Sequence, residues 1–164
     1  MANICSFNMV VVGNTEENIN LFCDIMNQNG TTWMGRGAEA SIDNIEYKDG
    51  NYRAEISGWC KNSVEAAMVD NAISMREHPE IWSSHGKDRD GNKLTFVTIY
   101  EACEMLSLDM EVYSEEPGCE FQEHYLFRDG VLELEETEHY EVVYNEETED
   151  YEGVGGFEEW AFEI

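Results

Sequence analysis

The sequence predicts an α+β fold in which helices pack on one face of an antiparallel sheet. β-rich and helical patterns alternate along the chain in the order strand, helix, two strands, two helices and three strands. The last strands are joined by short turns, as antiparallel neighbours are. With 164 residues, 42% of them hydrophobic, the chain is long enough to bury one core.

The first half of the chain begins with a strand and a helix. Residues 4–14 (ICSFNMVVVGN) predict a strand that ends at Gly13. Asn14 is then placed to cap a helix, because Glu17 follows three residues later, as in a capping box. We expect this helix to bury the residues at helical spacing, which are Ile19, Phe22, Cys23 and Met26.

The remaining elements follow from the same patterns. Residues 41–59 predict a hairpin that turns at Asp49-Gly50. Residues 62–75 predict a helix, and residues 76–93 a polar loop. The second half predicts a helix over 98–108, strands over 109–114, 120–130, 131–135 and 140–144, and a turn at 115–118.

Acidic and apolar residues alternate along the last predicted strands. Leu132 and Leu134 are expected on one face of a strand, with Glu133 and Glu135 on the other. Alternation likewise separates Tyr140, Val142 and Tyr144 from Glu141 and Val143. An antiparallel sheet that is buried on one side leaves its other face in water. The carboxylates are therefore expected to project from an ordered sheet.

The charge of the chain is strongly negative and unevenly placed. Asp and Glu number 36 and Lys and Arg 9, which gives a net charge of −27. Residues 1–100 hold 14 acids and 8 bases, whereas residues 101–164 hold 22 acids and only Arg128. Such a field attracts basic partners and repels nucleic acid and anionic membranes. Simple solubility is the alternative explanation.

Few residues suggest chemistry. Asp88, Asp90 and Asn92 imitate the start of a calcium-binding loop. Lys93 and Ile99 stand where that loop requires glycine and glutamate, so we expect a turn held by Asx side chains. His124 and His139 lie near glutamates but lack metal-binding spacing, and we expect surface or hydrogen-bonded histidines. We predict no catalytic residue, metal or cofactor; an enzyme or metal protein is the third alternative for function.

The cysteines and the apolar runs indicate where the protein acts. No C-x-x-C pair occurs, so we expect free, mostly buried thiols rather than a zinc or iron–sulfur site. The longest aliphatic run, MVVV, is too short to span a membrane, and no signal peptide opens the chain. We expect a protein of a reducing cytosol. The cysteines are Cys5, Cys23, Cys60, Cys103 and Cys119.

The chain is predicted to comprise one domain, residues 1–144, and an acidic, aromatic extension, residues 145–164. The composition of residues 145–156 (NEETEDYEGVGG) favours disorder. The last nine residues fit either a helical stripe or an alternating strand, and both would give their aromatic rings a surface to pack on.

Two stretches resemble the YubB-like ferredoxin-domain proteins. MANICSFNMVVVGN is similar to the first strand of that family, with Cys5, Asn8 and Gly13 in the matching places, and VYSEEPGCEFQEHYLFRDG is similar to its strand, turn and strand, with Glu116, Pro117, Gly118 and Phe121 in place. The chain keeps Trp59 but lacks the prolines of the family's Trp-Ser-Pro-Pro-like segment, and its last twenty residues have no counterpart there. The resemblance implies a ferredoxin-like fold and an origin on plasmids or phages; it implies no activity, cofactor or catalytic residue.

Together these observations predict a phage- or plasmid-encoded inhibitor that imitates nucleic acid. Its partner would be a basic nucleic-acid-binding protein of the host, a CRISPR effector or a restriction enzyme, bound without direct contact to nucleic acid or membrane. The predicted partner-binding residues are Glu115, Glu116, Glu133, Glu135, Glu136, Glu138, Tyr140, Glu141, Tyr144, Glu146, Glu147, Glu149 and Asp150. The alternative is a non-catalytic accessory module of a mobile element, whose acidity serves only solubility and whose partner docks near residues 33–37.

Overall fold

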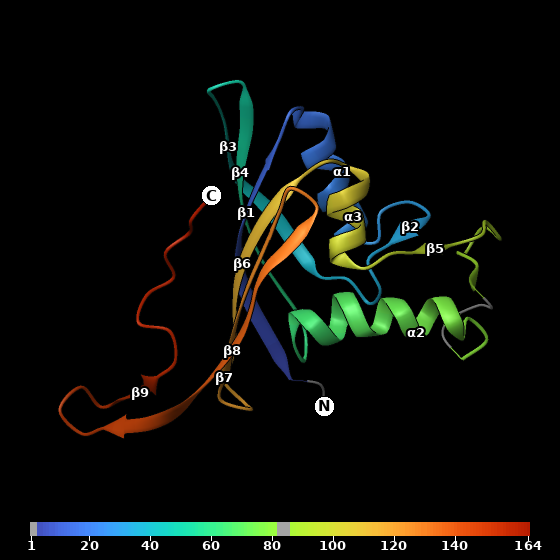
Figure 1. The fold of residues 1–164 in the computed structure, drawn as a ribbon. Coiled ribbons are helices and arrows are strands. Elements are labelled where there is room, and N and C mark those ends of the chain that lie inside the picture. The colour runs from blue at the N-terminus through green and yellow to red at the C-terminus, as the bar shows by residue number, and fades with distance from the viewer. Residues whose placement is uncertain (1–2, 82–85) are drawn as a thin grey trace.

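The computed structural model describes residues 3–81 and 86–164 and is mostly β, with 47% strand and 21% helix. Seven strands form one antiparallel sheet in the order β3-β4-β1-β6-β7-β8-β9 (Figure 1). The strands are β1 (Ile4–Gly13), β3 (Glu39–Lys48), β4 (Asn51–Lys61), β6 (Asp109–Glu116), β7 (Phe121–Arg128), β8 (Val131–Asn145) and β9 (Asp150–Gly155). A separate parallel pair joins β2 (Thr32–Trp33) to β5 (Thr95–Phe96).

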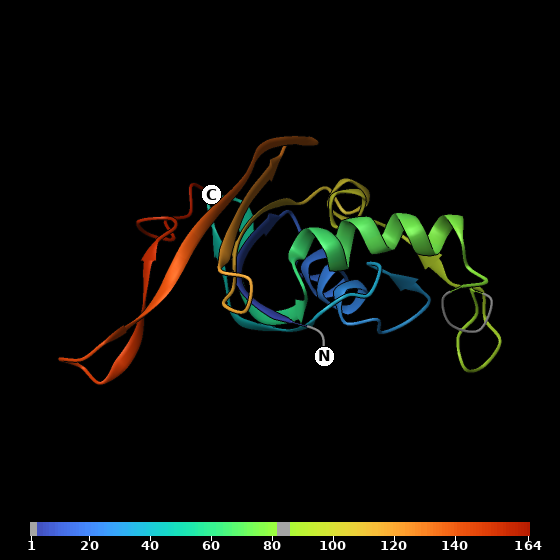
Figure 2. The same ribbon diagram turned by 90° about the horizontal axis from the view of Figure 1, so that it is seen from below.

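The helices are short and lie on the concave side of the sheet (Figure 2). They are α1 (Glu16–Met26), the π-helical turn η1 (Ala66–Asp70) that continues into α2 (Asn71–Glu77), and α3 (Ile99–Met105). Alternate residues of β1, from Cys5 to Val11, point to this side and pack with α1 and α3 into the main hydrophobic core.

The prediction of a ferredoxin-like sheet with helices packed on one face is wrong. The sheet instead has seven strands and curls into a half-cylinder around three short helices. Its strands are longer than predicted, because β6 continues through Glu115 and Glu116, and β8 runs for 15 residues through what we expected to be two strands. The right-handed twist between neighbouring strands accumulates over this width and curls the sheet.

Several local predictions are confirmed. The predicted helical positions Ile19, Phe22, Cys23 and Met26 are all buried on α1. The hairpin turns at Asp49 and Gly50, both with positive φ, so that Lys48 pairs with Asn51. Asp88 Oδ1 accepts hydrogen bonds from the backbone N–H groups of Asp90 and Asn92, as an Asx turn requires. All five cysteines are free, and all but Cys119 are buried.

Other local predictions are wrong. The cap of α1 is Thr15 rather than Asn14: Thr15 is extended, and its Oγ1 accepts the N–H of Asn18 at 3.2 Å. The predicted polar loop 76–93 contains the end of α2, and its residues 82–85 lie outside the described part of the chain. The strands β2 and β5 were missed because two residues are too few to show a pattern.

A bulge changes the faces of β8. Leu132 pairs with Phe127 and Leu134 pairs with Leu126, with a register shift between the two pairs. Leu126 and Phe127 are consecutive and point to opposite faces, so Leu132 and Leu134 do as well. Leu132 packs on the core, and the expected common face for the two leucines is wrong. Beyond the bulge the pairing is regular, as far as His139 opposite Phe121.

A buried glutamate joins the sheet to the first turn of the helix that leads into α2. Glu123, on the concave face of β7, is 2% exposed. Its Oε1 accepts hydrogen bonds from Val64 N (2.9 Å) and Ser114 Oγ (2.7 Å). Its Oε2 accepts from the Tyr125 hydroxyl (2.6 Å) and from Glu65 N (3.3 Å). The carboxylate therefore satisfies backbone N–H groups that a helix start leaves unpaired.

Replacement of this glutamate should strongly destabilise the protein. Glu123→Ala leaves these four donors, three of them buried, without their acceptor. We expect a loss of about 3–5 kcal/mol in the free energy of unfolding. Urea denaturation followed by circular dichroism measures it. The exposed Glu104→Ala serves as the control and should unfold at nearly the parent urea concentration. Equal midpoints for the two variants would show that Glu123 does not hold the helix.

Candidate functional site

The C-terminal half of β8 extends beyond β7 and forms an arm with β9. Residues 131–139 pair with β7, whereas residues 140–145 pair with β9. The two strands and the turn between them, residues 140–155, are here called the arm. It extends away from the body of the protein (Figure 2). Residues 145–156, whose composition favours disorder, thus form the turn and the second strand of a hairpin. The predicted boundary of the first domain, at residue 144, falls inside β8.

One face of the arm is apolar and aromatic. Tyr144 pairs with Tyr151 across the two strands, and their ring centroids lie 5.3 Å apart. Val142 lies on the same face, opposite Gly153. Tyr144 is 53% exposed and Tyr151 is 68% exposed, so this face is open to a partner. An isolated two-stranded hairpin gains little from its own packing, and exposed aromatic residues of this kind are typical anchors at protein interfaces.

The other face and the tip of the arm are acidic. Glu141, Asp150 and Glu152 lie on the face opposite the tyrosines, together with Val143 and Val154. The tip carries Glu146, Glu147 and Glu149, all exposed. No ion pair involves these acids within residues 3–81 and 86–164, and no Lys or Arg occurs after residue 128.

The structure does not bring all the predicted partner-binding residues together. The arm gathers Glu141, Tyr144, Glu146, Glu147, Glu149 and Asp150, all of them exposed. Glu136 and Glu138 lie on the convex side of β8, opposite His124 and Gln122. Glu135 lies on the helix side, opposite Tyr125.

Four of the predicted partner-binding residues are buried or form contacts with other residues of the protein. Glu116 is buried and accepts the backbone N–H groups of Gly118 and Cys119 in the turn after β6. Glu115 accepts from the Gln122 side chain, and Glu133 pairs with Arg128 at 2.6 Å. Tyr140 is 6% exposed at the base of the arm.

Tyr140 fixes the point where the arm leaves the sheet. Its ring is covered by β9 at Gly153, where an added Cβ would lie 3.4 Å from the ring. Gly155, directly opposite, has a φ of 97° and starts the turn that sends the chain back over the sheet. Tyr140 is therefore a structural residue of the arm's base.

The segment after the arm, residues 157–164, is here called the strap. It has no regular secondary structure and lies on the convex face of the sheet, opposite the helices (Figure 1). Neither the helix nor the strand predicted for it is formed. Its rings surround Tyr113 of β6: Trp160 stacks at 5.7 Å, and Phe157 and Phe162 meet Tyr113 edge-on at 5.7 and 5.3 Å.

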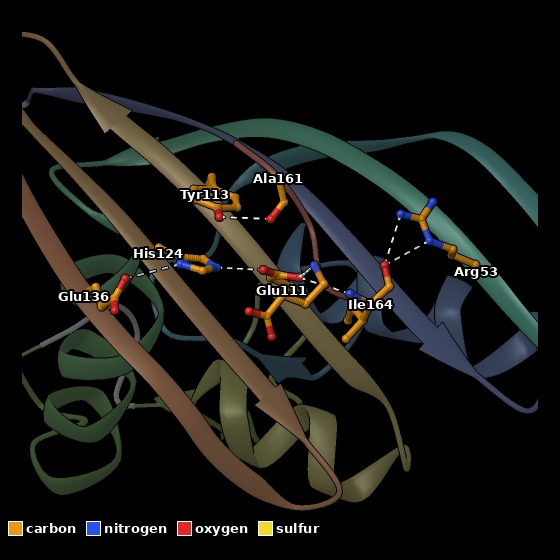
Figure 3. Close-up of polar contacts among 8 residues, drawn as sticks. Arg53, Glu111, Tyr113, His124, Glu136, Ala161 and Ile164 are labelled. Atoms are coloured by element: carbon orange, nitrogen blue, oxygen red, sulfur yellow. Dashed lines mark hydrogen bonds and ion pairs between the residues drawn. The ribbon is translucent and has the colours of Figure 1, made fainter. Parts of the chain in front are cut away.

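Polar contacts fix the end of the strap (Figure 3). Glu111, on the convex face of β6, is 0% exposed, and its Oε1 accepts the N–H groups of Glu163 (2.6 Å) and Ile164 (3.3 Å). The Tyr113 hydroxyl donates to the backbone oxygen of Ala161 at 3.1 Å. The Arg53 guanidinium donates twice to the backbone oxygen of Ile164, at 3.2 Å each.

His124 completes this cluster. Its ring is stacked on Tyr113 at a centroid distance of 3.9 Å, and its Nε2 lies 2.7 Å from Glu111 Oε2. Its Nδ1 lies 3.6 Å from Glu136 Oε2 on β8. The prediction of surface or hydrogen-bonded histidines is confirmed for both residues: His124 is hydrogen-bonded, and His139 is exposed. The ring thus links β6 to β8 beneath the strap.

The sequence analysis did not identify Glu111 and Tyr113 as the residues that hold the strap. Alternation in residues 109–114 places the two on one face of β6. A carboxylate and a phenol that are neighbours on one face of a central strand need polar partners. The end of the chain contains aromatic rings that can pack against the phenol. Their pairing depends on the sheet order, which the local pattern does not contain.

No group of three or more His, Cys, Asp or Glu side chains suited to a metal ion occurs among the described residues. Within the same residues, no helix is both long and apolar enough to cross a membrane. Comparison of the chain with models of known protein families, with curated proteins and with solved structures gives no match. The resemblance to the YubB-like proteins therefore stays a prediction.

Loss of the Glu111 carboxylate should release the end of the strap. Glu111→Ala removes two hydrogen bonds to a charged acceptor, so the amides of Glu163 and Ile164 should exchange with solvent about 100-fold faster. Hydrogen exchange followed by NMR measures this, and the emission of Trp160 should shift to the red. The matched control is Glu159→Ala, an exposed strap residue. Unchanged protection in the Glu111 variant would show that the rings alone hold the strap.

Proposed function

We propose that this protein is a binding protein that places its acidic arm in the nucleic-acid groove of a basic partner. In this proposal the partner is a host protein that targets foreign nucleic acid, a CRISPR effector or a restriction enzyme, and the chain is an inhibitor encoded by a phage or plasmid. The arm, rather than the whole acidic sheet, takes the place of the nucleic acid.

The observation that carries the proposal is a projecting hairpin with unpaired carboxylates. Three acids lie along the six residue pairs between β8 and β9, which span about 20 Å, and three more lie in the turn at the tip of the arm. One nucleic-acid strand carries a phosphate about every 3.4 Å, or about six over the same length. The arm with its tip therefore carries about as many charges as a single strand of similar length, and a groove lined with Lys and Arg would attract both.

The rest of the arm suits a specific contact. Charge alone gives fast association but little specificity, whereas Tyr144 and Tyr151 offer an apolar anchor beside the carboxylates. Both ends of the arm are tied to the body, since β8 continues into the sheet and β9 continues into the strap. A tethered arm loses less conformational entropy on binding than a free acidic tail.

Reversal of charge on the arm should abolish inhibition. The variant replaces three acids of the arm by Lys: Glu141, Glu146 and Glu147. Cleavage of a plasmid by a panel of restriction endonucleases and RNA-guided nucleases is then measured in the presence of the parent protein or the variant. We expect the parent protein to inhibit a member of the panel and to compete with DNA. This inhibition should weaken steeply as the salt concentration rises. The triple variant should bind about 10- to 100-fold more weakly.

The control has the same change of net charge elsewhere on the surface. Asp24, Glu77 and Glu104 are exposed and lie outside the arm and strap. Their replacement by Lys should leave inhibition near the parent level. An equal loss of inhibition in the two triple variants would show that net charge, rather than the arm, is responsible. Inhibition that does not depend on salt concentration would contradict the proposal.

A shortened arm separates the proposal from the accessory-module alternative. Val142 and Gly153 face each other, so an Asn-Gly turn can join them and remove the tip without touching the strap. The proposal expects this variant to lose inhibition while circular dichroism shows an unchanged fold. Full inhibition by the shortened protein would favour a partner that docks elsewhere, with the acidity serving only solubility.

A further inference from the structure

The two faces of the arm carry different chemistry. The strand register places Tyr144 opposite Tyr151 on one face. It places Glu141, Asp150 and Glu152 on the other face, each opposite an uncharged residue of the neighbouring strand. Because side chains of a strand alternate between its faces, the rings and these carboxylates point in opposite directions. The arm therefore has a ring side and a carboxylate side.

The two tyrosine rings are available to a partner. Their planes are inclined by 63°, so the rings meet edge to face and do not cover each other as a parallel stack would. More than half of the surface of Tyr144 and of Tyr151 is exposed. Within the described part of the chain, neither ring has a second aromatic neighbour. The ring side of the arm can therefore receive further planar groups.

A single strand of nucleic acid has the same two-sided arrangement. Its phosphates follow the backbone, and its unpaired bases can turn to the other side, whereas a duplex keeps its paired bases inside and its phosphates outside. Proteins that hold single strands combine a positively charged groove with aromatic side chains on which the bases stack. The carboxylates of the arm match the first of these features, and the tyrosine rings match the second.

The width of the arm also favours a single strand. Its two strands lie about 4.8 Å apart, and a β-ribbon with its side chains is about 10 Å thick. The major groove of duplex DNA is by itself about 12 Å wide, so the whole duplex is wider than the arm. A groove shaped for a duplex would leave part of the arm without contacts, whereas a channel shaped for one strand would surround it.

We propose that the arm takes the place of a single-stranded nucleic acid, and that its partner holds single strands. This inference rests on the proposed function and decides between the two classes of partner named there. RNA-guided nucleases have a groove for the strand that is displaced from their target, whereas restriction endonucleases hold duplex DNA. The partner is therefore an RNA-guided nuclease. The basic residues of its single-strand groove bind the carboxylates, and Tyr144 and Tyr151 lie where bases stack.

Displacement of labelled oligonucleotides from the panel of nucleases tests this inference. Each nuclease is loaded with a fluorescent single-stranded oligodeoxythymidine or a fluorescent duplex of the same length, the whole protein is added, and fluorescence anisotropy reports release. We expect release of the single strand from at least one RNA-guided nuclease and of no duplex from a restriction endonuclease. Release of duplex DNA from a restriction endonuclease, or of duplex DNA alone from any nuclease, would overturn this inference and leave the proposed function intact. Release of neither polymer would overturn both.

Tyrosine variants then locate the contact. Tyr151→Val removes a ring but keeps a side chain suited to a strand, so release of the single strand should require about 5- to 100-fold more protein. Tyr144→Val should show a similar loss, and the amide NMR signal of Val154 reports whether the arm is formed in each variant. The matched control is Tyr47→Val, because Tyr47 is similarly exposed and also pairs across two strands with a tyrosine, Tyr52. Parent potency in both arm variants, or an equal loss in Tyr47→Val, would overturn the inference.

Discussion

The buried carboxylate of Glu111 determines how the convex face of this protein is built. It sits on a central strand with no exposed surface, and it is stabilised by backbone N–H groups of the strap and by the ring of His124. Without these donors a carboxylate at this position would be strongly unfavourable. Its burial therefore requires the strap, and the strap in turn fixes the second strand of the arm. A single polar residue in β6 thus holds the end of the segment that follows the arm, about 50 residues later in the sequence.

Buried glutamates that accept backbone N–H groups also occur on the concave face and in a turn. Glu123 accepts N–H groups at the start of the helix, and Glu116 accepts N–H groups in the turn after β6. Among the described residues, no Lys or Arg pairs with any of these three buried carboxylates. Backbone N–H groups do this instead, and they hold a charge in place without the side-chain entropy of a long basic residue. The acidity of the chain thus has a structural part, which lies inside, and an exposed part, six residues of which lie on the arm.

The sequence contained the local elements but not their assembly. The strand β1, the helical spacing in α1 and the Asp49-Gly50 turn are properties of short segments, and each was predicted correctly. The curl of the sheet, the bulge at Leu132 and the continuity of β8 depend on how strands pair, and local patterns do not report pairing. The same limit explains the site: the acids of the arm were visible as composition, whereas Glu116 and Tyr140 were predicted as exposed because their neighbours from distant strands could not be known.

The uneven charge of the chain has a physical consequence. Eight of the nine Lys and Arg residues occur before residue 94. The arm, which carries six acids without an ion pair among the described residues, includes β9 at one end of the strand order, and β3 is at the other end. In the electrostatic field of a basic partner, a molecule with this charge distribution is oriented before contact, with the arm foremost.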